Sequence, residues 1–390
     1  MENKPLSKIR VLDLTQNICG PLCTQYLYDL GAEVIKIESP EGDESRKRGT
    51  TYGDTSIAYM YVNRGKKSVT LDITKSEQKD ILLRLAEKSD IIVEDLGAGK
   101  ADELGVGYEA VKNVKDDIVY LSITNFGHKG PFKNYEGNDA ILQAISGYMS
   151  LTSMTYQGKF MKLTTPMSDL MGGMYAVISA VAGLIHRKKT GESIYVDVSK
   201  LSCMLMCMPD SYAKYMTYGE KAFPTGNAHR MSAVFYPMPT KDGAIICNPD
   251  NRNPSETKWQ NFCREIGIPE EWYEDDKFNS LKSRLEHRSE VEEMVNAHTV
   301  NFTVAEIEEI CRKYKIAAGV MNDMKQLVEQ PQTVHDRLII SVHDNKEGDF
   351  RVMGCPLKFS EFDTLGDSFV DQPGEHTAEV LENLLGIKAE

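Results

Sequence analysis

The sequence predicts an α/β fold built on a mostly parallel, doubly wound sheet. Short apolar segments at residues 9–14 (IRVLDL), 33–37 (EVIKI) and 118–124 (IVYLSIT) have the composition of buried strands. Helical patterns of about ten residues separate such segments. A strand, a crossing helix and a second parallel strand form a right-handed βαβ unit. Repeating this unit gives a parallel sheet with helices on both faces.

Start and stop signals indicate the helix that connects the first two predicted strands. Pro21 suits the first turn of a helix at about 21–30, because the first N–H groups of a helix have no partner inside it. Gly31 stands where that helix would end. The further elements expected in this half are a short strand at 69–71, a helix at 76–88, a strand at 90–94, a helix at 108–114 and an apolar helix over 170–185.

The chain changes character after about residue 200, where it becomes rich in Met and Tyr. Residues 238–247 are typical of a hairpin centred on Asp242-Gly243. Charged helices follow over 259–312, so we expect a second, smaller α+β unit here. Residues 319–362 return to short strands and turns, and a short helix is expected at 376–385.

Charge and composition exclude several classes of function. The 390 residues carry 45 Lys and Arg against 58 Asp and Glu, a formal net charge of −13. Such an acidic chain is poorly suited to non-specific nucleic-acid binding. The apolar stretch at 170–185 is interrupted by glycines and is shorter than the roughly 20 residues that a membrane span needs. The N-terminus lacks the apolar core of a secretory signal, so we expect a soluble protein without membrane partners.

The eight cysteines predict reduced thiols rather than disulfides or a metal site. Cys19 and Cys23, and likewise Cys203 and Cys207, lie four residues apart, but no histidine accompanies either pair. A chain of this length needs no disulfides for stability. The expected location is therefore the cytoplasm, and no metal is expected.

Signatures of nucleotide cofactors and of serine hydrolases are incomplete. Gly97-Ala98-Gly99 follows the strand expected at 90–94, but Asp102 stands where the dinucleotide fingerprint needs its third glycine. The sequence has no GxxxxGK[ST] loop and no G-x-S-x-G motif. A turn whose backbone amides hold a phosphate after this strand is still compatible with the sequence.

Asp169 is the most informative carboxylate, and it has two interpretations. It stands at the head of the apolar helix, where an aspartate can cap the helix by accepting an amide hydrogen bond. The same position suits a carboxylate held ionised and ready to attack as a nucleophile. Gly172 and Gly173 would let a ligand or a second helix approach closely.

Two basic clusters also lie in loops of this half. They are Arg46-Lys47-Arg48 and Arg64 with Lys66-Lys67. Both are explained either as solvated surface charge or as ligand contacts, since the loops of doubly wound folds bind ligands.

A series of short motifs runs in order through nearly the whole chain. It begins with Gly20-Pro21 and the run at 31–38 (GAEVIKIE), and it ends with Gly374-Glu375-His376-Thr377. Between them lie Asn63, Lys66-Lys67-Ser68, Leu71-Asp72, Glu94, Leu104-Gly105, Asp139, Gln143-Ala144, Ser146-Gly147, Asp169 with Gly173, Thr190-Gly191, Asp242-Gly243 and Ala318-Gly319. In this order and spacing the sequence resembles the family III CoA-transferases, which include carnitine, bile-acid and formyl-CoA transferases.

The resemblance implies a large Rossmann-like domain made from both chain ends and a smaller α+β domain from the later middle. On this chain the large domain would comprise residues 1–200 and 321–390, the small domain residues 225–320, and a linker residues 201–224. The resemblance also implies an interlocked homodimer, in which two subunits thread through each other like links of a chain.

The resemblance further implies acyl-CoA:carboxylate CoA-transferase chemistry without a metal. Asp169 aligns with the family's catalytic aspartate, which attacks an acyl-CoA thioester and passes through aspartyl-anhydride and aspartyl-CoA intermediates. Coenzyme A would bind as a substrate and product thioester, and a carboxylic acid would be the acceptor. Backbone amides, including that of Cys19, would hold the oxyanion. The expected CoA contacts are Ile18, Cys19, Lys66, Lys67, Asp95, Leu96, Gly97, Lys100, Asn138 and Asp139.

Two departures from the family pattern keep alternatives open. Glu103 stands where the family usually has an arginine that binds CoA phosphate, and Lys100 is a candidate to replace it. The related α-methylacyl-CoA racemases pair the aspartate with a histidine in a G-H-D segment, but this chain has Asn138 there, which cannot exchange a proton. The alternatives are therefore an acyl-CoA racemase or epimerase of the same fold, or a non-catalytic CoA-binding protein.

For the acid substrate, the sequence favours one larger than formate. The run of four glycines of the formyl-CoA branch is missing, and residues 147–151 (GYMSL) resemble the carnitine and bile-acid branch. Tyr212, Tyr215 and Tyr218 would surround a quaternary ammonium group if they line a pocket, and are otherwise core or dimer contacts. The expected acid is carnitine- or bile-acid-like, and the donor thioester is left open.

Overall fold

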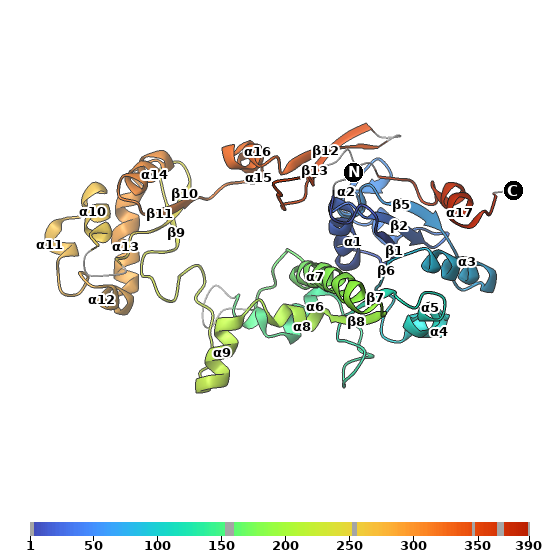
Figure 1. Cartoon of the computed structure of the whole chain (residues 1–390). Coiled ribbons are helices and arrows are strands. Elements are labelled where there is room, and N and C mark those ends of the chain that lie inside the picture. The colour runs from blue at the N-terminus through green and yellow to red at the C-terminus, as the bar shows by residue number, and fades with distance from the viewer. Residues whose placement is uncertain (1–3, 153–159, 252–255, 345–347, 365–369, 389–390) are drawn as a thin grey trace. The chain divides into compact units, whose positions relative to one another are not determined.

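The computed structural model describes residues 4–152, 160–251, 256–344, 348–364 and 370–388. The chain divides into two compact units (Figure 1). Unit 1 combines Met1–Tyr148, Lys162–Lys221 and Pro331–Glu390, and unit 2 combines Met149–Met161 with Ala222–Gln330. The segment expected as a linker, 201–224, contains two helices, α8 (Lys200–Leu205) and α9 (Pro209–Tyr218).

A six-stranded sheet forms the centre of unit 1. Its strands lie in the order β5-β2-β1-β6-β7-β8, and every neighbouring pair is parallel. The α/β class and the parallel sheet predicted from the sequence are confirmed, and the strand order reverses between β1 and β6. The strands are β1 (Arg10–Leu14), β2 (Glu33–Glu38), β5 (Lys67–Thr70), β6 (Ile91–Glu94), β7 (Val119–Thr124) and β8 (Ile194–Ser199).

Side chains of this sheet alternate between two cores on its opposite faces. Val11 on β1 belongs to one core together with residues of α1 (Cys19–Asp29) and α7 (Met167–Thr190). Leu12, the next residue, belongs to the other core together with residues of α3 (Ser76–Glu87) and α17 (Thr377–Leu385). Helices therefore cover both faces, which is the doubly wound arrangement.

Helix α7 is long and apolar enough, by length and composition, to cross a membrane. Its small residues Gly173, Ala176 and Ala180 are buried, and the helix packs along α1, β7 and β8. The core helix of a soluble protein passes the same test of length and composition. One such helix is weak evidence for a membrane span, and the buried side of α7 belongs to the core of unit 1.

Shorter elements surround the sheet in unit 1. The hairpin of β12 (Ile339–Asp344) and β13 (Gly348–Met353) shares a small core with α2 (Ile57–Asn63), through residues such as Val342 and Met60. The other elements are η1 (Glu44–Lys47), β3 (Thr51–Tyr52), β4 (Thr55–Ser56), α4 (Lys100–Leu104), α5 (Tyr108–Lys112), α6 (Asp139–Ile145) and α16 (Pro331–His335). The one-turn helix η2 (Tyr148–Ser150) stands where the chain first leaves unit 1.

Unit 2 is a small α+β unit with its own core. The predicted hairpin is present as the antiparallel pair β9 (Pro237–Pro239) and β10 (Ala244–Asn248), and β11 (Ala317–Val320) pairs with the other edge of β10. Trp259 and Phe262 are among the fully buried side chains of this core. The helices of unit 2 are α10 (Lys258–Glu265), α11 (Glu270–Tyr273), α12 (Leu281–Glu286), α13 (Arg288–Thr299), α14 (Val304–Lys313) and α15 (Met324–Glu329).

Candidate active site

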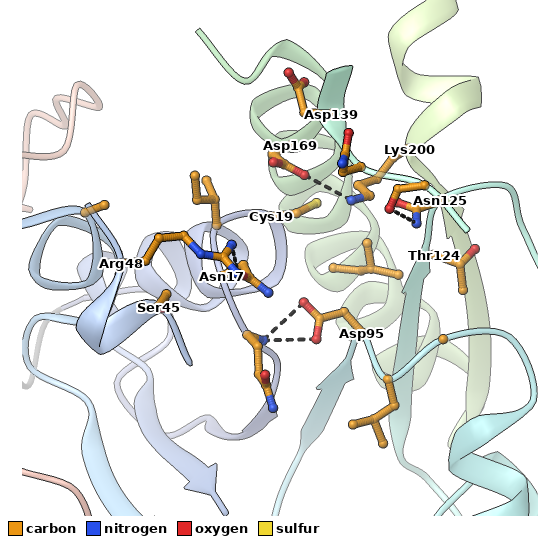
Figure 2. Close-up of a pocket in the computed structure, with 18 residues that line it drawn as sticks. Asn17, Cys19, Ser45, Arg48, Asp95, Thr124, Asn125, Asp139, Asp169 and Lys200 are labelled. Atoms are coloured by element: carbon orange, nitrogen blue, oxygen red, sulfur yellow. Dashed lines mark hydrogen bonds and ion pairs between the residues drawn. The ribbon is translucent and has the colours of Figure 1, made fainter. Parts of the chain in front are cut away.

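A cavity of about 470 Å³ lies in unit 1 at the carboxyl edge of the sheet, beyond the ends of β1 and β6 (Figure 2). The strand order reverses at this point, and open parallel sheets bind ligands in the crevice outside their strand ends at such a reversal. The volume falls in the range of small-molecule sites. The cavity is lined by Gln16, Asn17, Ile18, Cys19, Ser45, Arg48, Ala58, Asp95, Leu96, Gly97, Ile123, Thr124, Asn125, Gly137, Asn138, Asp139, Asp169 and Lys200.

Buried charges hold the turn between β1 and α1, which forms one wall of the cavity. The Asp13 carboxylate accepts hydrogen bonds from the N–H and the hydroxyl of Thr15 and from the hydroxyl of Thr24. Lys66 is also buried and lies 3.0 Å from Asp13, measured from Nζ to Oδ2. Burial lowers the pKa of Lys66 to about 8. Asn17 adopts a left-handed conformation in this turn, with φ of 64°.

Asp95, which follows β6, holds the same turn from the other side. Its two carboxylate oxygens lie 3.0 and 3.2 Å from the N–H nitrogen of Gln16. The preceding residue, Glu94, is buried and accepts a hydrogen bond from the N–H of Leu96 at 2.9 Å. Burial raises the pKa of Glu94 to about 7. Two acidic residues in succession thus fix the backbone on both sides of the crevice.

Asp169 is not the cap of helix α7, so the first interpretation of this residue was wrong. The helix begins at Met167, and Asp169 is its third residue. The capping bonds come instead from Asp139, whose Oδ1 accepts from the N–H of Ser168 at 2.8 Å and from its hydroxyl at 2.9 Å. Since Asp139 satisfies the helix start, the Asp169 carboxylate is left to face the cavity (Figure 2).

Lys200 is the ion-pair partner of Asp169. Its Nζ lies 3.0 Å from Oδ1 of Asp169, and the two side chains are only 15% and 17% exposed. Burial opposes the charge of Lys200, but the Asp169 carboxylate and other neighbours raise its pKa above the ordinary value. Within the described ranges of the chain, Oδ2 of Asp169 accepts no hydrogen bond. One oxygen of the carboxylate is therefore paired and the other is open.

Cys19 adds a neutral thiol to the same corner of the cavity. Burial raises the pKa of this thiol well above its ordinary value. Helix α7 approaches Cys19 closely, because a Cβ on Gly172 would lie 2.7 Å from its Sγ and one on Gly173 would lie 2.8 Å from its carbonyl oxygen. The two glycines therefore allow Asp169 to sit beside the start of α1.

The structure brings together most of the residues predicted for the site. Those that line the cavity are Asp169, Ile18, Cys19, Asp95, Leu96, Gly97, Asn138 and Asp139. The three lysines predicted as CoA contacts are not among its lining residues, because each is engaged elsewhere.

Each of these lysines has its own acidic partner. Lys66 is buried against Asp13 beneath the turn after β1. Lys67 forms ion pairs with Glu33 and Glu379 at 3.3 and 3.0 Å, and Lys100 pairs with Glu103 at 2.9 Å on the exposed surface of α4. Lys100 is thus engaged by the residue that replaces the family arginine.

The sequence analysis missed other residues of the cavity. Gln16, Asn17, Ser45, Thr124, Asn125 and Lys200 were not singled out, and Arg48 appeared only as part of a basic cluster. Lys200 directly follows β8, which was not predicted. The alternating segment IYVDVS of β8 carried the signal, because the residue after a parallel strand lies at the carboxyl edge of the sheet.

This arrangement suits nucleophilic attack on a carbonyl group. Helices α1 and α7 both begin at the cavity, and the partial positive charge of a helix N-terminus favours anions. The first N–H groups of α1, including that of Cys19, have no partner within the helix and suit a developing oxyanion. The open oxygen of Asp169 supplies the nucleophile.

Comparisons with known proteins agree on one family. The model of the CoA-transferase family III matches residues 6–377. The chain is 31% identical to the human succinyl-CoA:glutarate CoA-transferase over 98% of this chain and 86% of that protein. It is 28% identical to the formyl-CoA:oxalate CoA-transferase of an Escherichia coli strain, over 97% of this chain and 95% of that one. Among solved structures, a CAIB/BAIF family protein from Brucella suis superposes with a TM-score of 0.89 at 28% identity, covering 98% of this chain and all of that one.

Proposed function

The chain belongs to CoA-transferase family III and is a CoA-transferase, and we propose that Asp169 is its covalent nucleophile. The observation that carries this proposal is the position of the carboxylate. It is held at the crevice of the sheet, paired through one oxygen to Lys200 and open at the other. Asp139 caps the start of α7, so neither oxygen of Asp169 is used for that purpose.

In the proposed reaction, CoA is transferred from donor to acceptor in four steps through covalent intermediates on the Asp169 carboxylate. Its oxygen attacks the donor thioester, so a C–O bond forms, the C–S bond breaks, and CoA leaves as a thiolate. The thiolate then attacks the aspartyl carbonyl of this anhydride, which releases the donor acid and gives aspartyl-CoA. The acceptor carboxylate attacks aspartyl-CoA and expels the thiolate again. Finally the thiolate attacks the acceptor's acyl carbonyl, which forms the new acyl-CoA and frees Asp169.

We propose that the thioester end of CoA enters between the ends of β1 and β6. Ile18, Cys19, Leu96 and Gly97 line this part of the cavity, and their backbone N–H groups are the proposed contacts of the thioester. The N–H of Cys19 is placed at the start of α1, as an oxyanion donor should be. Because Lys66, Lys67 and Lys100 are not among the lining residues of this cavity, we base recognition of the thioester end of CoA on these backbone groups.

For the acceptor we propose a dicarboxylic acid in place of the carnitine- or bile-acid-like acid expected from the sequence. Both curated relatives described above carry a dicarboxylate, glutarate or oxalate, in their names. The cavity offers a second cation, Arg48, which donates to Asn17 Oδ1 at 2.7 Å. Its pair with Glu44 at 3.6 Å is exposed to solvent, so the guanidinium would still be able to pair with a remote carboxylate.

The tyrosines considered for a quaternary ammonium group support this change. None of them is among the lining residues of the described cavity. Tyr215 and Tyr218 are exposed on α9, and the Tyr212 hydroxyl donates to the carbonyl of Ser146.

We also propose a homodimer that works in the cytoplasm. Helix α7 buries one side against the sheet and exposes Met174, Ile178 and Ile185 on the other. An exposed apolar stripe on a core helix is typical of a surface covered by another chain. All eight cysteines are free, which fits a reducing compartment.

The test of the proposed function is intact-protein mass spectrometry after incubation with a panel of acyl-CoAs. Wild type and Asp169→Asn are compared, with hydroxylamine or borohydride to trap the activated carboxylate. A trapped adduct at Asp169 that the variant lacks is the expected result, together with formation of glutaryl-CoA or another dicarboxyl-CoA. A wild type that forms no adduct with any donor contradicts the proposal.

Deuterium exchange at the α-carbon of an acyl-CoA would instead support the racemase alternative. In the racemases a histidine would exchange the proton at this position. Here the side chain of Asn138 accepts from the N–H of Ile141 and caps α6, which does not support that alternative. A chain that binds CoA but shows neither adduct nor exchange would be a binding protein.

A further inference from the structure

We propose that Lys200 is a second charged member of the catalytic centre, which holds Asp169 before attack and then pairs with the CoA thiolate that the attack releases. This inference rests on the proposed function and adds a residue to it. Lys200 contacts the reacting carboxylate directly, through the 3.0 Å pair between Nζ and Oδ1.

The backbone holds Lys200 in this place independently of any ligand. Lys200 is the first residue of α8, whose start is capped by Ser199, the last residue of β8. The N–H of Leu201 donates to the carbonyl of Asn125, which follows β7, at 3.0 Å. Met204, one turn along α8, is fully buried. The strand end and the buried helix therefore fix the point from which the lysine reaches the cavity.

The absence of a side chain at Gly172 leaves room for the side chain of Lys200. A Cβ at residue 172 would lie 3.0 Å from Cγ of Lys200 and 2.7 Å from Sγ of Cys19. The stem of Lys200 thus runs across the first turn of α7 at a position where only a glycine fits without displacement. A surface lysine would not need this space, whereas the side chain of Lys200 is only 15% exposed.

The charges of the proposed steps explain why a fixed cation is useful here. Before attack, the carboxylate of Asp169 is negative and Lys200 balances it. When the carboxylate is acylated, it becomes a neutral anhydride and the negative charge moves to the departing sulfur. An ammonium has three N–H donors and stays close to the atoms over which this charge travels. Lys200 keeps its proton throughout and exchanges only its anionic partner.

The groups that interact electrostatically with Lys200 are Asp169, Cys19 and Asp95, so the ammonium is the positive charge among them. Cys19 stays a neutral thiol because of its burial. Burial raises the pKa of Asp95 well above its ordinary value, and its carboxyl group is already bound to the N–H of Gln16. A cation preorganised in a partly buried site stabilises a developing anion more strongly than it would in water.

The test compares Lys200→Met, Lys200→Arg and Lys200→Ala with wild type and with Lys88→Met, a matched loss of charge on the exposed end of α3. We expect Lys200→Met to lower kcat by about 100-fold or more, the effect of removing one preorganised group from such a site. KM for the acyl-CoA should stay within about threefold, because the ground-state thioester group carries no charge for Lys200 to hold. Lys88→Met should behave as wild type.

Chemical rescue separates a role in charge from a role in folding. We expect propylammonium to restore part of the activity of Lys200→Ala, whereas 1-propanol of similar size should not. Lys200→Arg should recover at least a tenth of the wild-type kcat. The mechanism also predicts a slower appearance of the trapped Asp169 adduct in Lys200→Met during a single turnover.

Two results would overturn the inference while leaving the proposed function standing. One is a Lys200→Met enzyme with kcat within threefold of wild type. The other is an inactive Lys200→Met accompanied by a Lys200→Arg enzyme and a propylammonium-treated Lys200→Ala enzyme that regain no activity, which would make the residue a packing element. If the wild type itself transfers no CoA, the proposed function fails and this inference fails with it.

Discussion

Removal of the Asp139 carboxylate should weaken the fold and displace the nucleophile at the same time. Asp139 Oδ1 accepts two hydrogen bonds from Ser168, and Oδ2 accepts one from Nε2 of Gln143 at 2.7 Å. Ser168 and Gln143 are both fully buried. Asp139→Ala would therefore leave buried donors of Ser168 and Gln143 without this acceptor, and Ser168 directly precedes Asp169 in the sequence.

The size of the effect follows from these contacts. Loss of a helix-capping side chain costs about 0.5–2 kcal/mol, and each buried donor left unsatisfied costs about 1–3 kcal/mol. Gln143 keeps longer bonds to the carbonyls of Leu163 and Thr165, so we place the total at about 2–4 kcal/mol. Asp139→Asn retains an oxygen acceptor and should lose less than half as much.

Urea denaturation at pH 7 measures the stability of both variants, and steady-state kinetics measure the site. We expect Asp139→Ala to lower kcat at least tenfold, since the residue after Ser168 is the nucleophile, with little change in the Kd of free CoA. A variant that keeps its wild-type stability but loses CoA affinity would refute this reasoning. Asp139 would then be the CoA contact expected from the sequence.

Three further outcomes follow from the contacts already described. Glu94→Gln should stabilise the protein at pH 8 by about 3 kcal/mol and leave its stability unchanged near pH 4. The pKa of this carboxyl group is raised from 4.5 to about 7 in the folded state, so its ionisation destabilises the fold as the pH rises through that window. Denaturation at the two pH values checks this. Lys66→Met should cost about 3–5 kcal/mol in the same assay, since it removes the ion-pair partner of the buried Asp13 carboxylate, and adding Asp13→Asn should recover much of the loss. Arg48→Gln should raise KM for a dicarboxylic acceptor about tenfold and leave KM for a monocarboxylic acid unchanged, as competition kinetics with the two acids would show.

Much of the sheet could be predicted because its strands are buried on both faces. Segments such as 118–124 consist almost entirely of apolar residues, and the structure has β7 there. The missed strand, β8, lies at the edge of the sheet, and its burial alternates instead of being continuous. The pattern of an edge strand is weaker, so the residue at its carboxyl end, Lys200, was missed with it.

The basic residues show why the rest of the site could not be predicted from sequence. Local sequence does not separate four basic residues that lie in a short helix or beside element ends, namely Arg46, Arg48, Lys66 and Lys200. What separates them is the position of distant carboxylates. Arg46 forms an ion pair with Glu38 at 2.6 Å and Lys66 forms one with Asp13, and both pairs are buried. Arg48 and Lys200 face the cavity.

A basic residue contributes to catalysis only if the fold leaves its charge within reach of a ligand or of the reacting group. The partners that decide this for Lys66 and Lys200 lie 53 and 31 residues away along the chain. Spacing along the sequence therefore cannot decide between them, whereas the parallel sheet does. It brings the ends of β1, β6 and β8 to one edge, so that residues from three separate stretches line the same cavity as Asp169.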